Sequence, residues 1–408
     1  MAVKDSFRAL LRPNYRRRRL VAVLGVLAVG AGVASALLLP GGSKHSALPR
    51  PAQVSTGAAT TVQARGGPAL PRGVSDLMRR MTVERKVAQL LLVGFDGTGP
   101  GAPVFGDMTR LDIGGLVIGS GNFGGRPQLE RLTAFAEQVA KRRGHVAPWL
   151  LTIQDGGGAS QLAGLPPTHS PSGLSSLQRA ASEASAAARA LHALGINGVL
   201  GPDVDVDTPT GGAYTDLSYS SDPAQVARFA AITVRAYARE KMLTAPKHFP
   251  GLGAASQPTD QGVAEVGLTL NQLASRDLVP FKTAIDAGAR GIVLGHGLYT
   301  TDSFATPASE SPALINQLLR ANLRFLGIAI TDDLESPAIT DNQKVPAAAV
   351  AAIKAGADMV FISGPRTDEL AAYQALLGAV QHGQIPAARL DASVERILLA
   401  KRALGLIP

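Results

Sequence analysis

Eight short apolar runs, most of them separated by longer helix-like stretches, constrain the fold of residues 75–408 more than any other feature. Helix-like stretches include residues 176–194 and 223–241. Continuous apolar strands that alternate with helices indicate a parallel sheet buried on both faces. Eight such units predict an α/β fold of the (β/α)8 barrel type in one domain, with a doubly wound open sheet as the alternative. The apolar runs are residues 87–96, 113–122, 148–157, 196–207, 243–251, 290–297, 327–334 and 358–365.

Polar side chains gather at the carboxyl ends of seven of these runs. In a barrel those ends share one face, and barrel enzymes carry their sites there. A strand end that merely meets water is also polar, but the density of charged groups on seven strands favours a functional face. The residues are Asp96, Asn122, Gln154, Asp155, Asp203, Asp205, Asp207, Lys247, His248, His296, Asp332 and Asp333.

The sequence ITDDLES, residues 330–336, places Asp332 directly after an apolar strand. A rigid strand would hold this carboxylate at the rim, as a nucleophile or a metal ligand requires. Neighbouring strand residues point to opposite sides, so we expect one aspartate to be chemical and Asp333 to cap the following helix.

The run GPDVDVDT places three aspartates at every second position, Asp203, Asp205 and Asp207. The spacing of a calcium loop with its distal Glu is absent, which favours a hydrogen-bonding network. A metal hydrolase needs clustered histidines, whereas His248 and His296 stand alone in the sequence. We therefore expect no metal and no other cofactor.

The net charge of +9 is concentrated in the first 50 residues, which contain nine Lys and Arg against one Asp. The rest of the chain is nearly neutral, and aromatic residues make up only 4% of the whole chain. This composition gives no electrostatic footprint for nucleic acid. The chain has no cysteine, so disulfides and thiolate metal sites are excluded.

The amino-terminal region predicts export. A basic tail, residues 1–19, precedes an apolar segment without charge, residues 20–40. This segment is long enough for a membrane anchor with the arginines in the cytoplasm. A cleaved signal peptide is the alternative, since residues 34–36 read Ala-Ser-Ala. A Gly-, Pro- and Ala-rich linker, residues 41–74, follows. We expect a barrel tethered outside a cell membrane, or secreted after cleavage.

Several motifs resemble those of glycoside hydrolase family 3, nearest to its bacterial β-N-acetylglucosaminidases. They are KHFPGLG, GPDVDVDT, SDP, DLVPFKTAIDAGARGIVLGH and ITDDL, and they occur in the family's order. The resemblance covers residues from about 77 to the end. It implies a retaining glycosidase with a single barrel, acting on a cell-wall carbohydrate.

The resemblance also implies roles for individual residues. Asp332 matches the nucleophile of the family. The residues implied for sugar binding are Lys247, His248, His296, Asp205 and Asp155.

The sequence departs from the family where the proton donor is expected. The family's Asp-Ser/Thr-His triplet corresponds to Asp260-Gln261-Gly262, and the second His of its GHG motif is Leu252. A glutamine does not donate a proton at a useful pKa. Two further sugar-holding positions are apolar, namely Ile153 in place of an Asp and Leu217 in place of an Arg. The Arg that ends the family's strand-3 motif is Gly158.

Three interpretations follow from these departures. In the first, Asp260 or the nearby Glu265 replaces the histidine as acid/base. In the second, the enzyme retains weak activity on good leaving groups. In the third, the barrel is a non-catalytic sugar-binding or scaffold protein. We expect hydrolysis of a terminal β-linked N-acetylglucosamine or similar sugar, with Asp260 as the acid/base.

Overall fold

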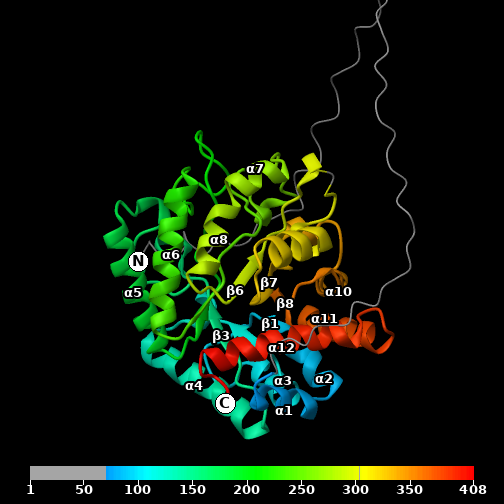
Figure 1. Ribbon diagram of the computed structural model, residues 1–408. Coiled ribbons are helices and arrows are strands. Elements are labelled where there is room, and N and C mark those ends of the chain that lie inside the picture. Colours follow the sequence, from blue (N-terminus) through cyan, green and yellow to red (C-terminus); the bar gives the residue numbers. More distant parts are fainter. Residues whose placement is uncertain (1–69, 303) are drawn as a thin grey trace, which may run out of the picture. The chain divides into compact units, whose positions relative to one another are not determined.

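The computed structural model describes residues 70–302 and 304–408, which form a parallel eight-stranded barrel surrounded by helices (Figure 1). The strand order β5-β4-β3-β2-β1-β8-β7-β6 confirms the (β/α)8 prediction over the open sheet. Every strand lies inside one of the eight predicted apolar runs. The strands are β1 (Leu91–Val93), β2 (Gly115–Val117), β3 (Trp149–Thr152), β4 (Gly198–Val199), β5 (Leu243–Thr244), β6 (Gly291–Leu294), β7 (Ile328–Asp333) and β8 (Met359–Ile362).

The segment that follows β5 closes the barrel. Phe249 N donates to Val293 O at 2.8 Å, and Gly295 N donates to Phe249 O at 2.9 Å, which joins this segment to β6. On its other side Lys247 pairs in parallel with Asp203. The backbone of the KHFPG motif is therefore bonded to a neighbouring segment on each side, so its side chains are held at the carboxyl end of the barrel.

Helices cover the outside of the barrel, and α6 packs against both α5 and α8. Their apolar faces and the strands form one core in which the strands up to Thr331 of β7 are buried. The helices are α1 (Arg72–Arg80), α2 (Val83–Ala88), α3 (Pro103–Arg110), α4 (Arg126–Arg143), α5 (Leu177–His192), α6 (Pro223–Arg239), α7 (Leu270–Ser275), α8 (Leu278–Asp286), α9 (Pro337–Thr340), α10 (Val345–Ala355), α11 (Arg366–Gln381) and α12 (Ala387–Ala403). A π-helical segment, η7, spans Ala313–Asn322.

The first described helix, α1, starts at Arg72, close to the predicted linker boundary at residue 75, and its residue Val74 is fully buried in the core. The predicted basic tail, the apolar segment 20–40 and most of the linker lie outside the described residues. Within the described ranges, no helix has both the length and the apolar character needed to cross a bilayer.

Candidate active site

Asp332 lies near the carboxyl end of β7 and lines a cavity of about 690 Å³. Its side chain is 22% exposed, and one of its oxygens, Oδ2, is 3.7 Å from Nε2 of His248. Burial alone would raise the pKa of Asp332, but the charges of His248 and Lys247 outweigh burial and hold this pKa below its usual range. The carboxylate is therefore ionised and reachable from the cavity, as a nucleophile must be.

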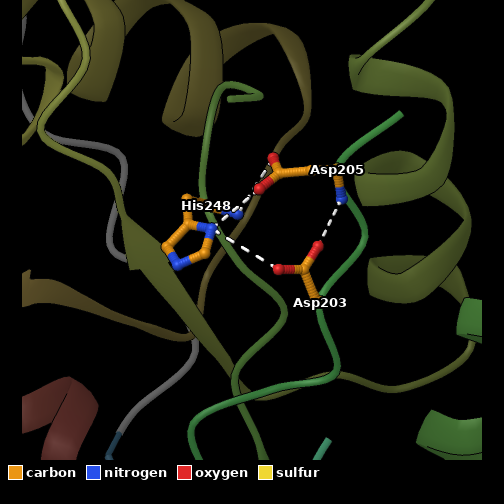
Figure 2. Close-up of side chains that lie close together, drawn as sticks. All are labelled: Asp203, Asp205 and His248. Carbon is orange, nitrogen blue, oxygen red and sulfur yellow. Dashed lines mark hydrogen bonds and ion pairs between the residues drawn. The ribbon is translucent and has the colours of Figure 1, made fainter. Parts of the chain in front are cut away.

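Asp205 orients His248 (Figure 2). Nδ1 of His248 donates to Oδ2 of Asp205 at 2.7 Å, while Oδ1 of Asp205 accepts from the backbone N–H of Leu252 at 2.7 Å. Burial lowers the pKa of His248, but Asp205 and Asp332 outweigh it and raise this pKa to about 9. His248 is thus a fixed imidazolium at neutral pH that faces the carboxylate of Asp332.

Asp203 completes this cluster without a hydrogen bond to the imidazole. Its Oδ1 accepts from Asp205 N at 2.9 Å, and its Oδ2 lies 3.8 Å from Nδ1 of His248 (Figure 2). Burial and the Asp205 charge raise the pKa of Asp203 well above its usual value. Asp205 is therefore the member of the cluster that hydrogen-bonds the imidazole, while Asp203 supports the backbone of Asp205.

Among the described residues, these three side chains form the cluster that could hold a metal ion. One ligand atom from each of Asp203, Asp205 and His248 lies within 4.8 Å of the others. However, Oδ2 of Asp205 and Nδ1 of His248 already bond to each other, and Oδ1 of Asp205 accepts from the backbone N–H of Leu252. The arrangement thus fits a hydrogen-bonding network that positions His248, as the sequence spacing favoured.

Lys247 and Asp155 form a second buried pair beside the cavity. Nζ of Lys247 donates to Oδ2 of Asp155 at 2.6 Å, and Oδ1 of Asp155 accepts from Asp203 N at 3.2 Å. Burial lowers the pKa of Lys247, but Asp155 outweighs it and raises this pKa. Both residues line the cavity, so a cation and an anion are available for sugar hydroxyls.

Asp333 does not cap the helix that follows β7, contrary to the sequence prediction. The N-cap of α9 is Ser336, whereas Oδ1 of Asp333 accepts from the backbone N–H of Glu335 at 3.2 Å and of Ser363 at 3.0 Å. The chain turns between β7 and α9, and the carboxylate of Asp333 links this turn to the residue that follows β8. Asp333 therefore positions the segment that contains Asp332.

His296 lies beside the end of β7 and is not among the described residues that line the cavity. Its Nε2 donates to the backbone oxygen of Asp333 at 3.0 Å, and its Nδ1 accepts from Oγ of Ser309 at 2.9 Å. Burial lowers the pKa of His296. A neutral imidazole with both nitrogens bonded supports the end of β7.

Asp260 reaches the cavity from the loop that lacks the family's histidine. It lies in the short turn η4 (Thr259–Gln261), is exposed, and lines the same cavity as Asp332. The turn is anchored, because Oγ of Ser336 donates to Thr259 O at 2.7 Å and Thr259 N donates to the hydroxyl of Tyr214 at 3.0 Å. The other sequence candidate, Glu265, is exposed and is not among the lining residues.

The substituted positions give the cavity an apolar side. Ile153 and Leu217, which occupy positions where the family resemblance implies Asp and Arg, both line it. Leu252 is fully buried, and its side chain packs against Gly295 and Gly297 rather than facing the cavity. The site thus combines the ionised carboxylate of Asp332 with a cavity poorer in charge than the family pattern implies.

Some of the predicted rim residues are structural. Nδ2 of Asn122 donates to Phe95 O and Gly97 O, which fixes the loop after β1. Gln154 bonds the backbone of Leu162 and of the residues that follow it. Asp207 lies eight residues beyond the end of β4, where its Oδ1 accepts from Thr208 N at 2.8 Å. Gln154 and Asp207 are thus loop anchors outside the lining of the cavity, whereas Asn122 both anchors a loop and lines the cavity.

The cavity residues that sequence reasoning missed include Tyr214 and Glu335. The ring of Tyr214 lies 5.4 Å from that of His248, and its hydroxyl holds Thr259. Its signal is weak, a single Tyr in a Gly- and Thr-rich loop after the aspartate run. Glu335 also lines the cavity, and its signal was a carboxylate three residues after the nucleophile in ITDDLES.

Comparison with known proteins agrees with this geometry. Residues 82–400 match the glycosyl hydrolase family 3 N terminal domain, so the chain belongs to this family. The chain is 31% identical over 316 residues to a protein named beta-hexosaminidase from Stenotrophomonas maltophilia, covering 72% of this chain and 92% of that protein.

Solved structures resemble the barrel as well. A family 3 beta-N-acetylglucosaminidase from a Paenibacillus species is 29% identical, with a TM-score of 0.77 over 80% of this chain and 63% of that one. A glycosyl hydrolase of the same family from Mycobacterium smegmatis is 27% identical, with a TM-score of 0.72 over 79% of this chain and 98% of that one. Both similarities place the described barrel among family 3 structures.

Proposed function

We propose that the protein is a retaining glycoside hydrolase that removes a terminal β-linked N-acetylglucosamine or a similar sugar. The observation that carries the proposal is Asp332, an ionised carboxylate at a strand end that faces a sugar-sized cavity beside the His248 imidazolium. The names of the beta-hexosaminidase and beta-N-acetylglucosaminidase relatives support this sugar.

In this reaction Asp332 attacks the anomeric carbon and forms a glycosyl-enzyme, which water then hydrolyses. Lys247, Asp155 and His248 bind hydroxyl groups of the sugar, while Asp205 and His296 act by holding their neighbours. A retaining enzyme also needs a group that protonates the leaving oxygen. Asp260 is the acid/base that the sequence suggests, and its turn places it at the same cavity.

A second function, sugar binding without catalysis, is favoured by one specific observation. Ile153 and Leu217 give the cavity apolar contacts at positions where the family resemblance implies charged side chains. Lost charged contacts weaken the holding of a substrate in its reactive geometry. A barrel of this kind would bind a glycan at the cell envelope and leave it intact.

For both functions we propose an extracytoplasmic location. The arginine-rich tail and the apolar segment 20–40 support either a membrane anchor or an export signal. In that compartment the natural carbohydrate would be an envelope glycan, such as peptidoglycan or a fragment of it.

The two functions are separated with the full-length protein and an aryl β-N-acetylglucosaminide. Phenol release is followed from the first seconds, beside an Asp332→Ala variant. An initial burst or steady release that the substitution abolishes supports the hydrolase. Release no faster than in Asp332→Ala, together with calorimetric binding of N-acetylglucosamine oligosaccharides, would instead support the binding protein.

A further inference from the structure

The cavity contains a second candidate for the missing proton donor. Asp260 is exposed on its turn, and its side chain makes no hydrogen bond to any described residue. Glu335 lines the same cavity from a different element, the turn after β7. A catalytic acid needs a fixed position and must be protonated at the working pH. The two carboxyl groups differ in both respects.

The position of Glu335 is fixed by its backbone and by its neighbour Gly364. Its N–H donates to Oδ1 of Asp333 at 3.2 Å, and the next residue, Ser336, is bonded to Thr259 O. A Cβ atom on Gly364 would lie 2.1 Å from Oε1 of Glu335. The carboxyl group therefore occupies space that is available because residue 364 has no side chain.

The surroundings of Glu335 favour its protonated form. Oε1 is buried and has no hydrogen-bond partner among the described residues. Burial, followed by the charges of Asp333 on the same turn and Asp368 on α11, raises the pKa of Glu335 to about 7. Another carboxyl group of α11, Glu369, also faces it and has a pKa raised to about 8. These groups disfavour a negative charge on Glu335.

We propose that Glu335 is the general acid/base that replaces the family's histidine. This inference depends on the proposed hydrolase function. While a carboxylate oxygen of Asp332 bonds to the anomeric carbon, the glycosidic C–O bond breaks and its oxygen takes the proton of Glu335. In the second step the Glu335 carboxylate accepts a proton from water, whose oxygen bonds to the anomeric carbon and releases Asp332. Glu335 is protonated again at the end.

The test uses the full-length Glu335→Gln variant and two substrates. Hydrolysis of unactivated chitobiose is expected to fall by roughly 10² to 10⁴-fold, because its leaving oxygen needs a proton. The first-step burst with a dinitrophenyl glycoside is expected to persist, since that leaving group departs without one. Azide is expected to restore turnover of the aryl glycoside and to yield a β-glycosyl azide. The fall of wild-type activity above pH 7 is expected to disappear.

Two further variants separate this role from a structural one. Glu310→Gln is the matched control, because the pKa of Glu310 is also raised to about 7 by burial although it is not among the residues lining the cavity. It is expected to leave both rates unchanged. Gly364→Ala retains the acid but displaces it, and is expected to lower chitobiose hydrolysis while sparing the burst.

The outcomes are distinguishable. An unchanged chitobiose rate in Glu335→Gln, or a selective loss in Asp260→Asn instead, overturns the assignment of Glu335 but leaves the hydrolase intact. Absence of an Asp332-dependent burst in the wild type overturns the hydrolase and this inference together. Selective loss in Glu335→Gln with azide rescue supports both.

Discussion

The two ends of the barrel treat buried carboxylates differently. At the amino-terminal end Asp358 accepts from Arg320 at 2.6 Å, from Arg396 at 2.9 Å, from Arg389 and Ser393, and from a backbone N–H, so both oxygens are paired. At the carboxyl end Oδ2 of Asp203 and Oε1 of Glu335 are buried without hydrogen bonds among the described residues.

This difference separates stability from chemistry. A buried carboxylate whose hydrogen bonds are all satisfied holds neighbouring elements together, and neither it nor its partners have a hydrogen bond left for a ligand. An unpaired buried oxygen costs free energy of folding, which is tolerated where a substrate or a proton uses that group. The amino-terminal face of barrels usually serves stability and the carboxyl-terminal face function.

The largest effect is expected from Asp332, the proposed nucleophile. Asp332→Ala removes the atom that bonds to the sugar in the proposed mechanism, so turnover of an aryl glycoside should fall by more than about 10⁴-fold, the upper end of what a proton donor contributes. The free energy of unfolding, measured in urea, should change little, because the removed carboxylate is partly exposed. A variant that unfolds more easily but retains activity would contradict the division between the two ends.

The next largest effect concerns stability at the opposite end. Asp358→Asn leaves Arg320, Arg389 and Arg396 without a buried anion, which should lower the free energy of unfolding by about 3–5 kcal/mol. The specific activity of the folded fraction should be unchanged. Asp391→Asn is the matched control, since its pair with Lys86 is 46% exposed at Asp391 and should contribute less than about 1 kcal/mol.

A smaller effect on activity is expected from Asp205, which holds the ring of His248 and the backbone of Leu252. Asp205→Asn should reduce kcat by roughly 10²-fold, as a misplaced catalytic group does. Since Asp205 raises the pKa of His248 to about 9, the substitution should lower this pKa, and NMR titration of the imidazole would detect the change. Asp207→Asn, two residues further on, should affect neither the rate nor the titration. An unshifted imidazole pKa in Asp205→Asn would contradict the positioning role.

The sequence predicted the barrel because its strands are continuous apolar runs, a pattern set by burial on both faces. It also predicted Asp332, Lys247 and His248 as cavity residues, since strand ends of a barrel converge. It did not predict that His296 bonds to the backbone of Asp333 instead of lining the cavity, or that the side chain of Asn122, which does line the cavity, anchors the loop after β1. Periodicity describes which face is buried, whereas a hydrogen-bond partner depends on loops whose path has no periodic signal.

Glu335 is a cavity residue that the sequence did not predict, again because its surroundings come from distant parts of the chain. Its neighbours on the sequence explain its position, but the space for its carboxyl group depends on Gly364, and its raised pKa depends in part on the charge of Asp368. Both residues lie about thirty residues further along the chain. Such a long-range environment determines whether a carboxyl group is an ordinary surface charge or a proton donor. Spacing from the nucleophile alone could not distinguish the two.

The smallest expected effect is a pH dependence of the free energy of unfolding that comes from Lys401, a buried amine near the amino-terminal end of the barrel. Its Nζ donates to Gln89 and to Gly114 O, both at 2.9 Å, and burial lowers its pKa to about 7. An unfolded lysine retains its proton to about pH 10.4, so between these values the unfolded state binds more protons. The wild-type free energy of unfolding should therefore rise with pH above 7, by at most about 1.4 kcal/mol per unit.

Lys401→Met removes this titration, so urea unfolding at pH 7 and 9 should give a flatter profile than the wild type. Other titrating groups are common to both proteins and cancel in the difference. Equal slopes would mean that Lys401 retains its proton in the folded state. The amino-terminal end of the barrel would then hold a charged amine by carbonyl oxygens alone, and the contrast between fully paired and unpaired charges would no longer distinguish the two ends.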